Sequence, residues 1–115
     1  MDVRCQDEDM SATSLDTTGL DQLEEARRSS NGRASKTLHH GHRLHQTLLA
    51  LTAGTRLAEH QSPGDATVHC LRGRVVLNSD ADSVAVPAGM LVDVPARRHD
   101  LVAEEDSLVV LTVAR

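Results

Sequence analysis

The sequence contains no phenylalanine, tyrosine or tryptophan among its 115 residues. A hydrophobic core must therefore be aliphatic, built from Val, Leu and Ala. The same lack excludes the aromatic platforms on which proteins stack the bases of single-stranded nucleic acids. A chain of this length is enough for one domain with a modest core.

Long apolar runs and basic patches are also missing. No apolar stretch approaches the roughly 20 residues that span a membrane, so we expect no membrane segment. Residues 1–30 carry eight acidic residues and three arginines, whereas residues 31–115 carry nine charges of each sign. Neither part has the basic patch of a nucleic-acid-binding surface, so we expect no nucleic-acid partner.

Cysteine is scarce, and the two that occur, Cys5 and Cys70, lie far apart. Such a pair makes no disulfide framework, and the N-terminal residues lack the basic and apolar parts of a secretion signal. We therefore expect a cytoplasmic protein. A Gly-rich phosphate loop, a Gly-x-Ser-x-Gly elbow, a CxxC pair and a His-Glu-x-x-His motif are absent, which removes several enzyme classes.

The first 30 residues divide into a leader and a helix. Residues 1–14 are polar and acidic, and this composition predicts disorder. Residues 16–29 have leucines at i and i+3, acidic residues early and arginines late, which predicts a helix that docks on a larger domain. Thr17 or Thr18 is expected to cap its N-terminus.

The rest of the chain alternates short apolar runs with turns rich in Gly, Pro, Asn and Asp. This pattern is typical of a β-sandwich or β-barrel. We predict one domain over residues 15–115, with the barrel over about residues 35–115. The predicted strands cover residues 36–39, 44–53, 67–71, 74–77, 84–86, 91–94, 99–103 and 108–113.

Four histidines, His39, His40, His42 and His45, lie within seven residues. A metal site needs such side chains to converge in a fixed geometry. Gly41 indicates a flexible turn between them, so we favour solvated histidines in a loop or at a sheet edge. The role of the cluster stays open.

Two spaced motifs carry a resemblance to a known family. In the first, Gly54 is followed after five residues by His60, and Gly73 closes the motif. In the second, Gly89 precedes Pro95 by six positions, and His99 follows. Over about residues 32–115 the chain resembles small single-domain cupins of undefined function, in the RmlC-like cupin superfamily. The resemblance implies an all-β fold, the cupin double-stranded β-helix or jelly-roll barrel, with one short N-terminal helix.

The resemblance also implies a metal site, which this sequence lacks in part. Metal-dependent cupins hold iron, manganese, nickel or zinc with three histidines and a glutamate. Here the second histidine position holds Ser62, and the glutamate position falls on Ala66. His60 and His99 remain as predicted metal ligands, and two histidines are too few for a tight site.

The strand that follows Ala66 decides whether another residue completes the metal site. Alternation places Ala66, Val68 and Cys70 on one face, towards the barrel lumen if the glutamate position faces it, with His69 on the other. Cys70 is then either a third, soft ligand or a buried residue that behaves like an aliphatic one, and we favour burial. Asp65 or Glu59 is a further alternative, although such carboxylates are usually solvated.

A ligand pocket is the alternative to a metal site. The predicted ligand-binding residues are His60, His99, Ser62, Gln46 and Arg97. Gln46 belongs to this set only if the face of Leu44, Gln46 and Leu48 turns towards the lumen. Arg97, with Arg98, offers a guanidinium clamp for an anionic ligand, and the alternative is a solvated turn.

Three functions remain compatible with the sequence. The first is a small-molecule-binding or sensor module with a degenerate metal site. The second is a metal-dependent oxygenase or isomerase that uses His60 and His99. The third is an oligomerising scaffold whose barrel is filled by Val and Leu side chains. The expected partners are an unidentified small molecule and, because the chain resembles cupins, a second copy in a homodimer.

Overall fold

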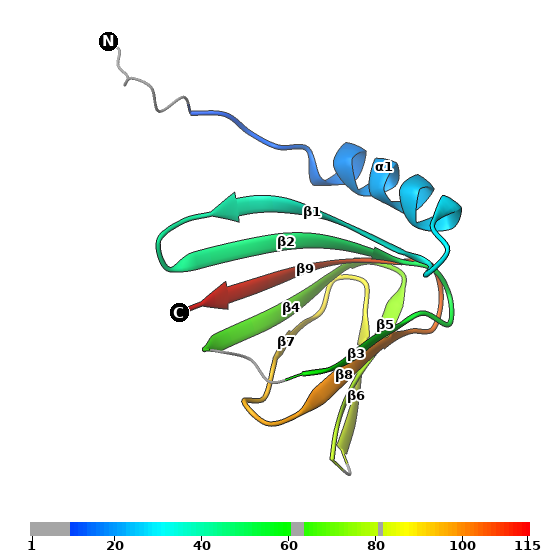
Figure 1. Ribbon diagram of the computed structural model, residues 1–115, viewed down its shortest axis with the longest axis vertical. Coiled ribbons are helices and arrows are strands. Elements are labelled where there is room, and N and C mark those ends of the chain that lie inside the picture. Colours follow the sequence, from blue (N-terminus) through cyan, green and yellow to red (C-terminus); the bar gives the residue numbers. More distant parts are fainter. Residues whose placement is uncertain (1–9, 61–63, 81) are drawn as a thin grey trace.

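We describe the protein from a computed structural model, which describes residues 10–60, 64–80 and 82–115 and omits the side chains of residues 58–60. Within these ranges the chain forms one helix followed by nine strands (Figure 1). Of the predicted leader, residues 1–9 lie outside the described residues. Residues 10–14 form no helix or strand, and their side chains are exposed.

Helix α1 spans Leu15–Arg28 and begins earlier than the sequence predicts. Ser14 is the N-cap, because its Oγ accepts a hydrogen bond from the backbone N–H of Thr17 at 3.1 Å. The prediction of a Thr17 or Thr18 cap is therefore wrong: the backbone N–H of Thr17 is one of the free donors that the cap satisfies. In the described residues no helix is long and apolar enough to cross a membrane.

The nine strands form two sheets that face each other (Figure 1). The five-stranded sheet has the order β1-β2-β9-β4-β7, and the four-stranded sheet has the order β3-β8-β5-β6. Each recorded pair of neighbours is antiparallel. The strand bounds are β1 Arg33–His40, β2 Leu44–Leu51, β3 Arg56–His60, β4 Asp65–Arg72, β5 Arg74–Ser79, β6 Asp82–Pro87, β7 Leu91–Asp93, β8 His99–Ala103 and β9 Ser107–Ala114.

The predicted fold is confirmed, with one strand missed. Strand β3 is only five residues long and contains one large apolar residue, Leu57. Its sequence pattern is therefore too weak to distinguish it from the turn that follows. The remaining strands lie where the sequence predicts them, with bounds that differ by up to three residues at the start and two at the end.

An aliphatic core fills the space between the two sheets. Its buried members are Leu51, Ala66, Val68, Cys70, Val75, Leu77, Val86, Val94, Leu101, Ala103 and Val109. Ala66, Val68 and Cys70 all face this interior, whereas His69 is exposed on the opposite face of β4. The predicted orientation of this strand is confirmed, and the glutamate position of the motif lies inside the barrel without a ligand atom.

A second, smaller apolar cluster joins the helix to the outer face of the five-stranded sheet. It contains Leu23 and Ala26 of α1, Ala50 of β2 and Leu108 of β9. Gly19 permits this close approach, because a Cβ atom there would lie 2.6 Å from Leu108 Cδ1. The helix therefore covers one end of this sheet, as Figure 1 shows.

Candidate functional site

His99 begins strand β8 and is buried, with 5% of its surface exposed. Leu101 and Ala103 of the same strand belong to the inner core, so alternation directs His99 to the interior as well. Its Nδ1 lies 3.0 Å from the carbonyl oxygen of Arg97. A carbonyl only accepts, so Nδ1 carries a hydrogen and donates it to this oxygen.

His60 ends strand β3, and its backbone pairs with His99 of strand β8. An irregularity between Leu57 and His60 shifts the register by one residue, which brings the two histidines opposite each other. The backbone thus brings the two predicted ligand positions together. The side chain of His60 and the whole of Ser62 lie outside the described residues.

The interior does not fit a metal held by three histidines and a glutamate. Ala66 occupies the glutamate position and is buried in the core. Cys70 is no substitute, because burial raises the pKa of its thiol and its Sγ lies 3.4 Å from the carbonyl oxygen of Arg72. Metal ligation needs the thiolate. Among the described residues, no three or more His, Cys, Asp or Glu side chains are grouped closely enough to hold a metal.

A cavity of about 340 Å³ lies between β5, β6 and the segment from β7 to Arg97, and His99 is not among its lining residues. Two buried residues of β5, Leu77 and Ser79, form its floor, and exposed or half-exposed residues form its rim. The rim residues are Asp82, Ser83, Val84, Val92, Asp93, Pro95 and Arg97. This volume lies near the lower limit of small-molecule sites, which is roughly 300 Å³.

Arg97 connects the cavity to the segment that holds His99. Its Nε lies 2.8 Å from Ser79 Oγ and 2.9 Å from Asp80 Oδ2, and an Nη lies 3.6 Å from Asp82 Oδ2. Ser79 Oγ in turn donates to the carbonyl of Arg98 at 3.1 Å. The two carboxylates more than offset the charge of Arg97, so these contacts do not favour the predicted clamp for an anionic ligand.

Gln46 lies on the outer face of β2. The expectation that its side chain turns towards the barrel lumen is therefore wrong. Its neighbour on the same face of β2, Ala50, packs against the helix, whereas Leu49 and Leu51 pack against the inner core. Gln46 Nε2 donates to Thr112 Oγ1 at 3.2 Å across the outer face of the five-stranded sheet. Both faces of β2 carry apolar residues, so the sequence alone could not decide between them.

A polar network crosses the outer face of the four-stranded sheet. Asp100 accepts hydrogen bonds from Arg56 Nε at 2.8 Å and from Asn78 Nδ2 at 2.8 Å. Ser83 donates to Asn78 Oδ1 at 2.6 Å. Burial alone would raise the pKa of Asp100, but the hydrogen bonds from Asn78 and Arg56 and the charge of Arg56 outweigh it and lower that pKa. The network ties the four strands together directly behind the site.

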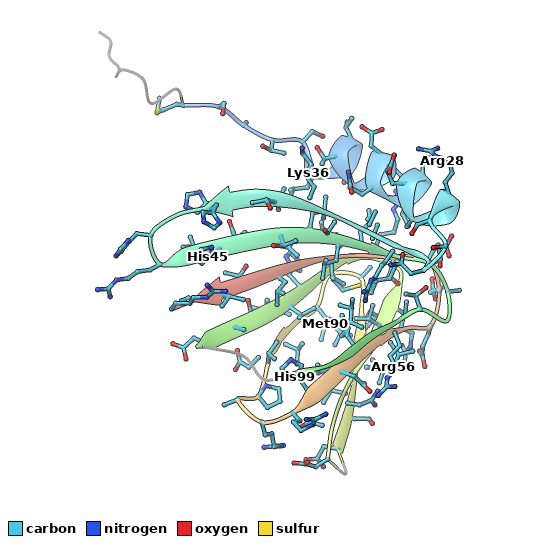
Figure 2. All side chains as sticks on the ribbon, in the orientation of Figure 1. Arg28, Lys36, His45, Arg56, Met90 and His99 are labelled. Carbon is cyan, nitrogen blue, oxygen red and sulfur yellow. The ribbon has the colours of Figure 1, made fainter. Side chains whose placement is uncertain are left out.

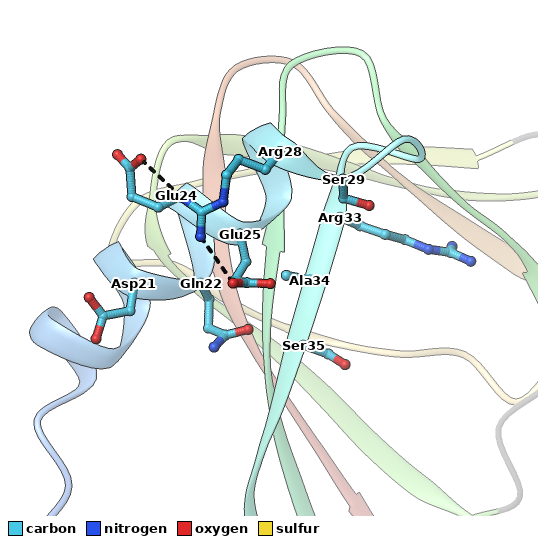
Figure 3. A pocket seen from close by; sticks show the side chains of 9 residues that line it. All are labelled: Asp21, Gln22, Glu24, Glu25, Arg28, Ser29, Arg33, Ala34 and Ser35. Carbon is cyan, nitrogen blue, oxygen red and sulfur yellow. Dashed lines mark hydrogen bonds and ion pairs between the residues drawn. The ribbon is translucent and has the colours of Figure 1, made fainter.

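A larger groove of about 760 Å³ lies between α1 and β1 (Figure 3). None of its lining residues is buried. Two acidic residues on its helix side pair with Arg28, which lies 3.0 Å from Glu25 and 3.9 Å from Glu24. A surface groove with internally paired charges lacks the enclosure and convergent polar groups of a ligand site, so we place the candidate site at the barrel mouth.

Sequence reasoning found Arg97 and His99 of this region but missed Ser79, Asp82 and Val84. Ser79 follows Val75 and Leu77 at two-residue steps, so alternation alone could have placed it on the inner face. Asp82 and Val84 carried no such signal, because their place at the mouth depends on how β6 pairs with β5.

Comparisons with known proteins agree with this geometry. No protein-family model and no curated protein matches the chain. Among solved structures, a conserved protein of unknown function from Streptococcus pyogenes is 31% identical, with 76% of this chain and 77% of that chain covered and a TM-score of 0.69.

Two further solved structures carry the family name. A cupin 2 conserved barrel domain protein from Leptotrichia buccalis is 26% identical, with 76% of this chain and 43% of that chain covered and a TM-score of 0.67. A cupin superfamily protein from Desulfitobacterium hafniense is 19% identical, with 71% and 76% covered and a TM-score of 0.68. The two motifs, the two facing sheets and these neighbours lead to one conclusion: this chain belongs to the cupin superfamily.

Proposed function

We propose that this protein is a small-molecule-binding or sensor module in which the cavity at the barrel mouth, rather than a metal centre, receives the ligand. The single observation that supports this proposal is the combination of a buried floor, Leu77 and Ser79, with a polar rim. An apolar wall with a few placed polar groups is the usual composition of a ligand site.

The charges at the rim indicate the class of ligand. Asp82, Asp93 and Arg97 line the cavity, and Asp80 pairs with Arg97 from outside it. Negative charge therefore exceeds positive charge around the opening, which disfavours a carboxylate or phosphate ligand. We infer a small polar ligand that is neutral or positively charged.

Binding calorimetry with three probe classes of similar size tests this proposal. The probes are neutral monosaccharides, primary amines with hydroxyl groups, and hydroxy acids. We expect the first two classes to bind more tightly than the hydroxy acids, and Arg97→Ala to weaken that binding by disordering the mouth. Arg72→Ala is the matched control, because Arg72 is exposed at the far end of β4.

Each other outcome contradicts the proposal in a different way. Tightest binding of the hydroxy acids, abolished in Arg97→Ala, would restore the anion clamp. No binding by any class would favour a scaffold whose barrel is filled by the aliphatic core. A metal-dependent oxygenase or isomerase would require stoichiometric iron, manganese, nickel or zinc that disappears in the His60→Ala/His99→Ala variant. The homodimer and the cytoplasmic location stay predictions, the former to be checked by light scattering.

A further inference from the structure

The β1–β2 hairpin brings two histidines face to face at its turn. His40 ends β1 and His45 lies near the start of β2, and the antiparallel register pairs them directly. Gly41 closes the turn by donating its backbone N–H to the carbonyl of Leu44 at 2.9 Å. The sequence predicted histidines in a loop or at a sheet edge, and β1 is an edge strand. Strand pairing fixes both backbones and directs both side chains to the same face.

The two imidazole rings present nitrogens to each other. Nδ1 of His40 lies 3.3 Å from Nδ1 of His45, and the ring centroids are 4.6 Å apart with an angle of 76° between the planes. The contact has the geometry of a hydrogen bond, and which ring donates depends on the tautomers. Its length lies just above the range of about 2.7–3.2 Å that is usual for N–H···O bonds.

The distance between the two Nδ1 atoms also matches a metal ion bound between them. A tetrahedral zinc ion bound to two imidazole nitrogens at roughly 2.0–2.1 Å holds those nitrogens roughly 3.3–3.4 Å apart. An ion with ligands at right angles would need a shorter separation of about 2.9 Å at the same bond length. We propose that His40 and His45 chelate a divalent transition-metal ion with tetrahedral preference, Zn²⁺ or Co²⁺, through their Nδ1 atoms.

The surroundings of His45 are consistent with the geometry of the pair. Partial burial, the charge of Arg115 and the neighbouring His40 and His39 lower the pKa of His45. The neutral imidazole that this favours is the metal ligand. The charge of Arg115 repels a cation, so binding should strengthen as salt screens it.

The site is incomplete and lies on a different sheet from the cupin motif positions. No three metal-ligating side chains are grouped together in the described part of the chain, so water or an external ligand must complete the coordination. His40 and His45 belong to the five-stranded sheet, whereas the cupin motif positions His60 and His99 belong to the four-stranded sheet. Figure 2 shows His45 on the hairpin and His99 on the opposite sheet. We expect weak and exchangeable binding, unlike that of a structural zinc site.

Titration of the full, untagged chain with Co²⁺ tests this site, because tetrahedral cobalt has an intense visible absorption band. We expect the wild type to develop that band, and His40→Ala and His45→Ala each to weaken binding by at least roughly tenfold. His69→Ala should bind as the wild type does, because His69 is an exposed strand histidine whose cross-strand neighbours are Val110 and Leu91. Circular dichroism checks that each variant is folded.

Imidazole ¹⁵N NMR of the wild type with Zn²⁺ gives a second measurement that needs no variant. Coordination should shift the Nδ1 signals of His40 and His45 and place the hydrogen on Nε2 of each ring. Failure of the wild type to bind either ion, binding that both variants retain, or zinc-induced shifts at His99 in place of the hairpin would each overturn the proposal.

Discussion

The two ends of the barrel interior are built from the same strands but differ in what fills them. Along the inner face of β5, Val75 at one end is fully buried, Leu77 follows, and Ser79 stands at the other end beside the cavity. Along β8, Ala103 at the end of the strand lies opposite Val75, and His99 at its start lies towards Ser79. The aliphatic end holds the fold together, and the polar end carries the groups that can recognise a ligand.

The comparison separates two kinds of contact. The contacts between the facing sheets are made by aliphatic residues, and Ala66, at the glutamate position of the motif, is one of them. The hydrogen bond from Arg97 to Ser79 and its ion pair with Asp80 lie at the other end.

The largest expected effect on the free energy of unfolding is at the aliphatic end of the barrel interior. Leu51→Ala removes a side chain with no exposed surface from the inner core. We expect the free energy of unfolding to fall by about 2–5 kcal/mol, because the surrounding strands cannot collapse into the gap. Chemical denaturation measures this change. The control Leu91→Ala, at a residue that is 62% exposed, should change it by less than about 0.5 kcal/mol. Equal effects would mean that the interior is not packed as described.

The second largest effect on the free energy of unfolding is expected in the polar network around Asp100, on the outer face of the four-stranded sheet. Asp100→Ala leaves Arg56 and Asn78 without their shared acceptor, and we expect a loss of about 1–3 kcal/mol in the free energy of unfolding. Because the folded-state pKa of Asp100 is lowered, its stabilisation is present above the unfolded pKa of about 3.9 and disappears as the pH falls through the folded pKa.

Denaturation curves from pH 6 down through the acid range check this sign. The wild type should lose stability as the pH falls below the unfolded pKa of about 3.9, and Asp100→Asn should lose less over the same interval because it has no carboxyl group to titrate there. Parallel pH curves for the two proteins would show that Asp100 does not contribute to acid sensitivity.

The smallest effect on the free energy of unfolding is expected at Arg97, on the rim of the cavity. The effect of this residue on ligand binding should be the largest. Arg97→Ala removes ion pairs that are about half exposed, so we expect a loss of less than about 1 kcal/mol. Thermal melting measures it alongside Leu51→Ala. A loss as large as that of Leu51→Ala would make Arg97 part of the structural core and remove the contrast between the two ends.

The sequence was sufficient for the fold because the glycine and proline spacings and the two-residue alternation are local signals. Gly73 is an example of such a local signal. Its φ of +83° and the close carbonyl of Asp106 leave no space for a side chain, so the turn requires glycine. The orientation of β4 followed from the same alternation, which correctly separated Ala66 from His69.

The site was less predictable because it depends on pairing between strands that are distant in sequence. The ion pairs of Arg97 with Asp80 and Asp82 exist only because β5, β6 and β8 meet at one end of the barrel. The facing rings of His40 and His45 depend on a register that includes an irregularity between Thr37 and His39. Neither arrangement leaves a pattern in residue spacing alone.

One measurement tests the central claim most directly: methyl NMR of the wild type during titration with the neutral monosaccharides and the hydroxylated amines. The account predicts shifts at Leu77, Val84 and Val92, which line the cavity, and none at Leu51, Val75 or Val109 in the closed end. Shifts at Leu51, Val75 or Val109 with none at the cavity residues would place ligand binding deep in the barrel. That result would contradict the division between a filled interior and a ligand-binding mouth.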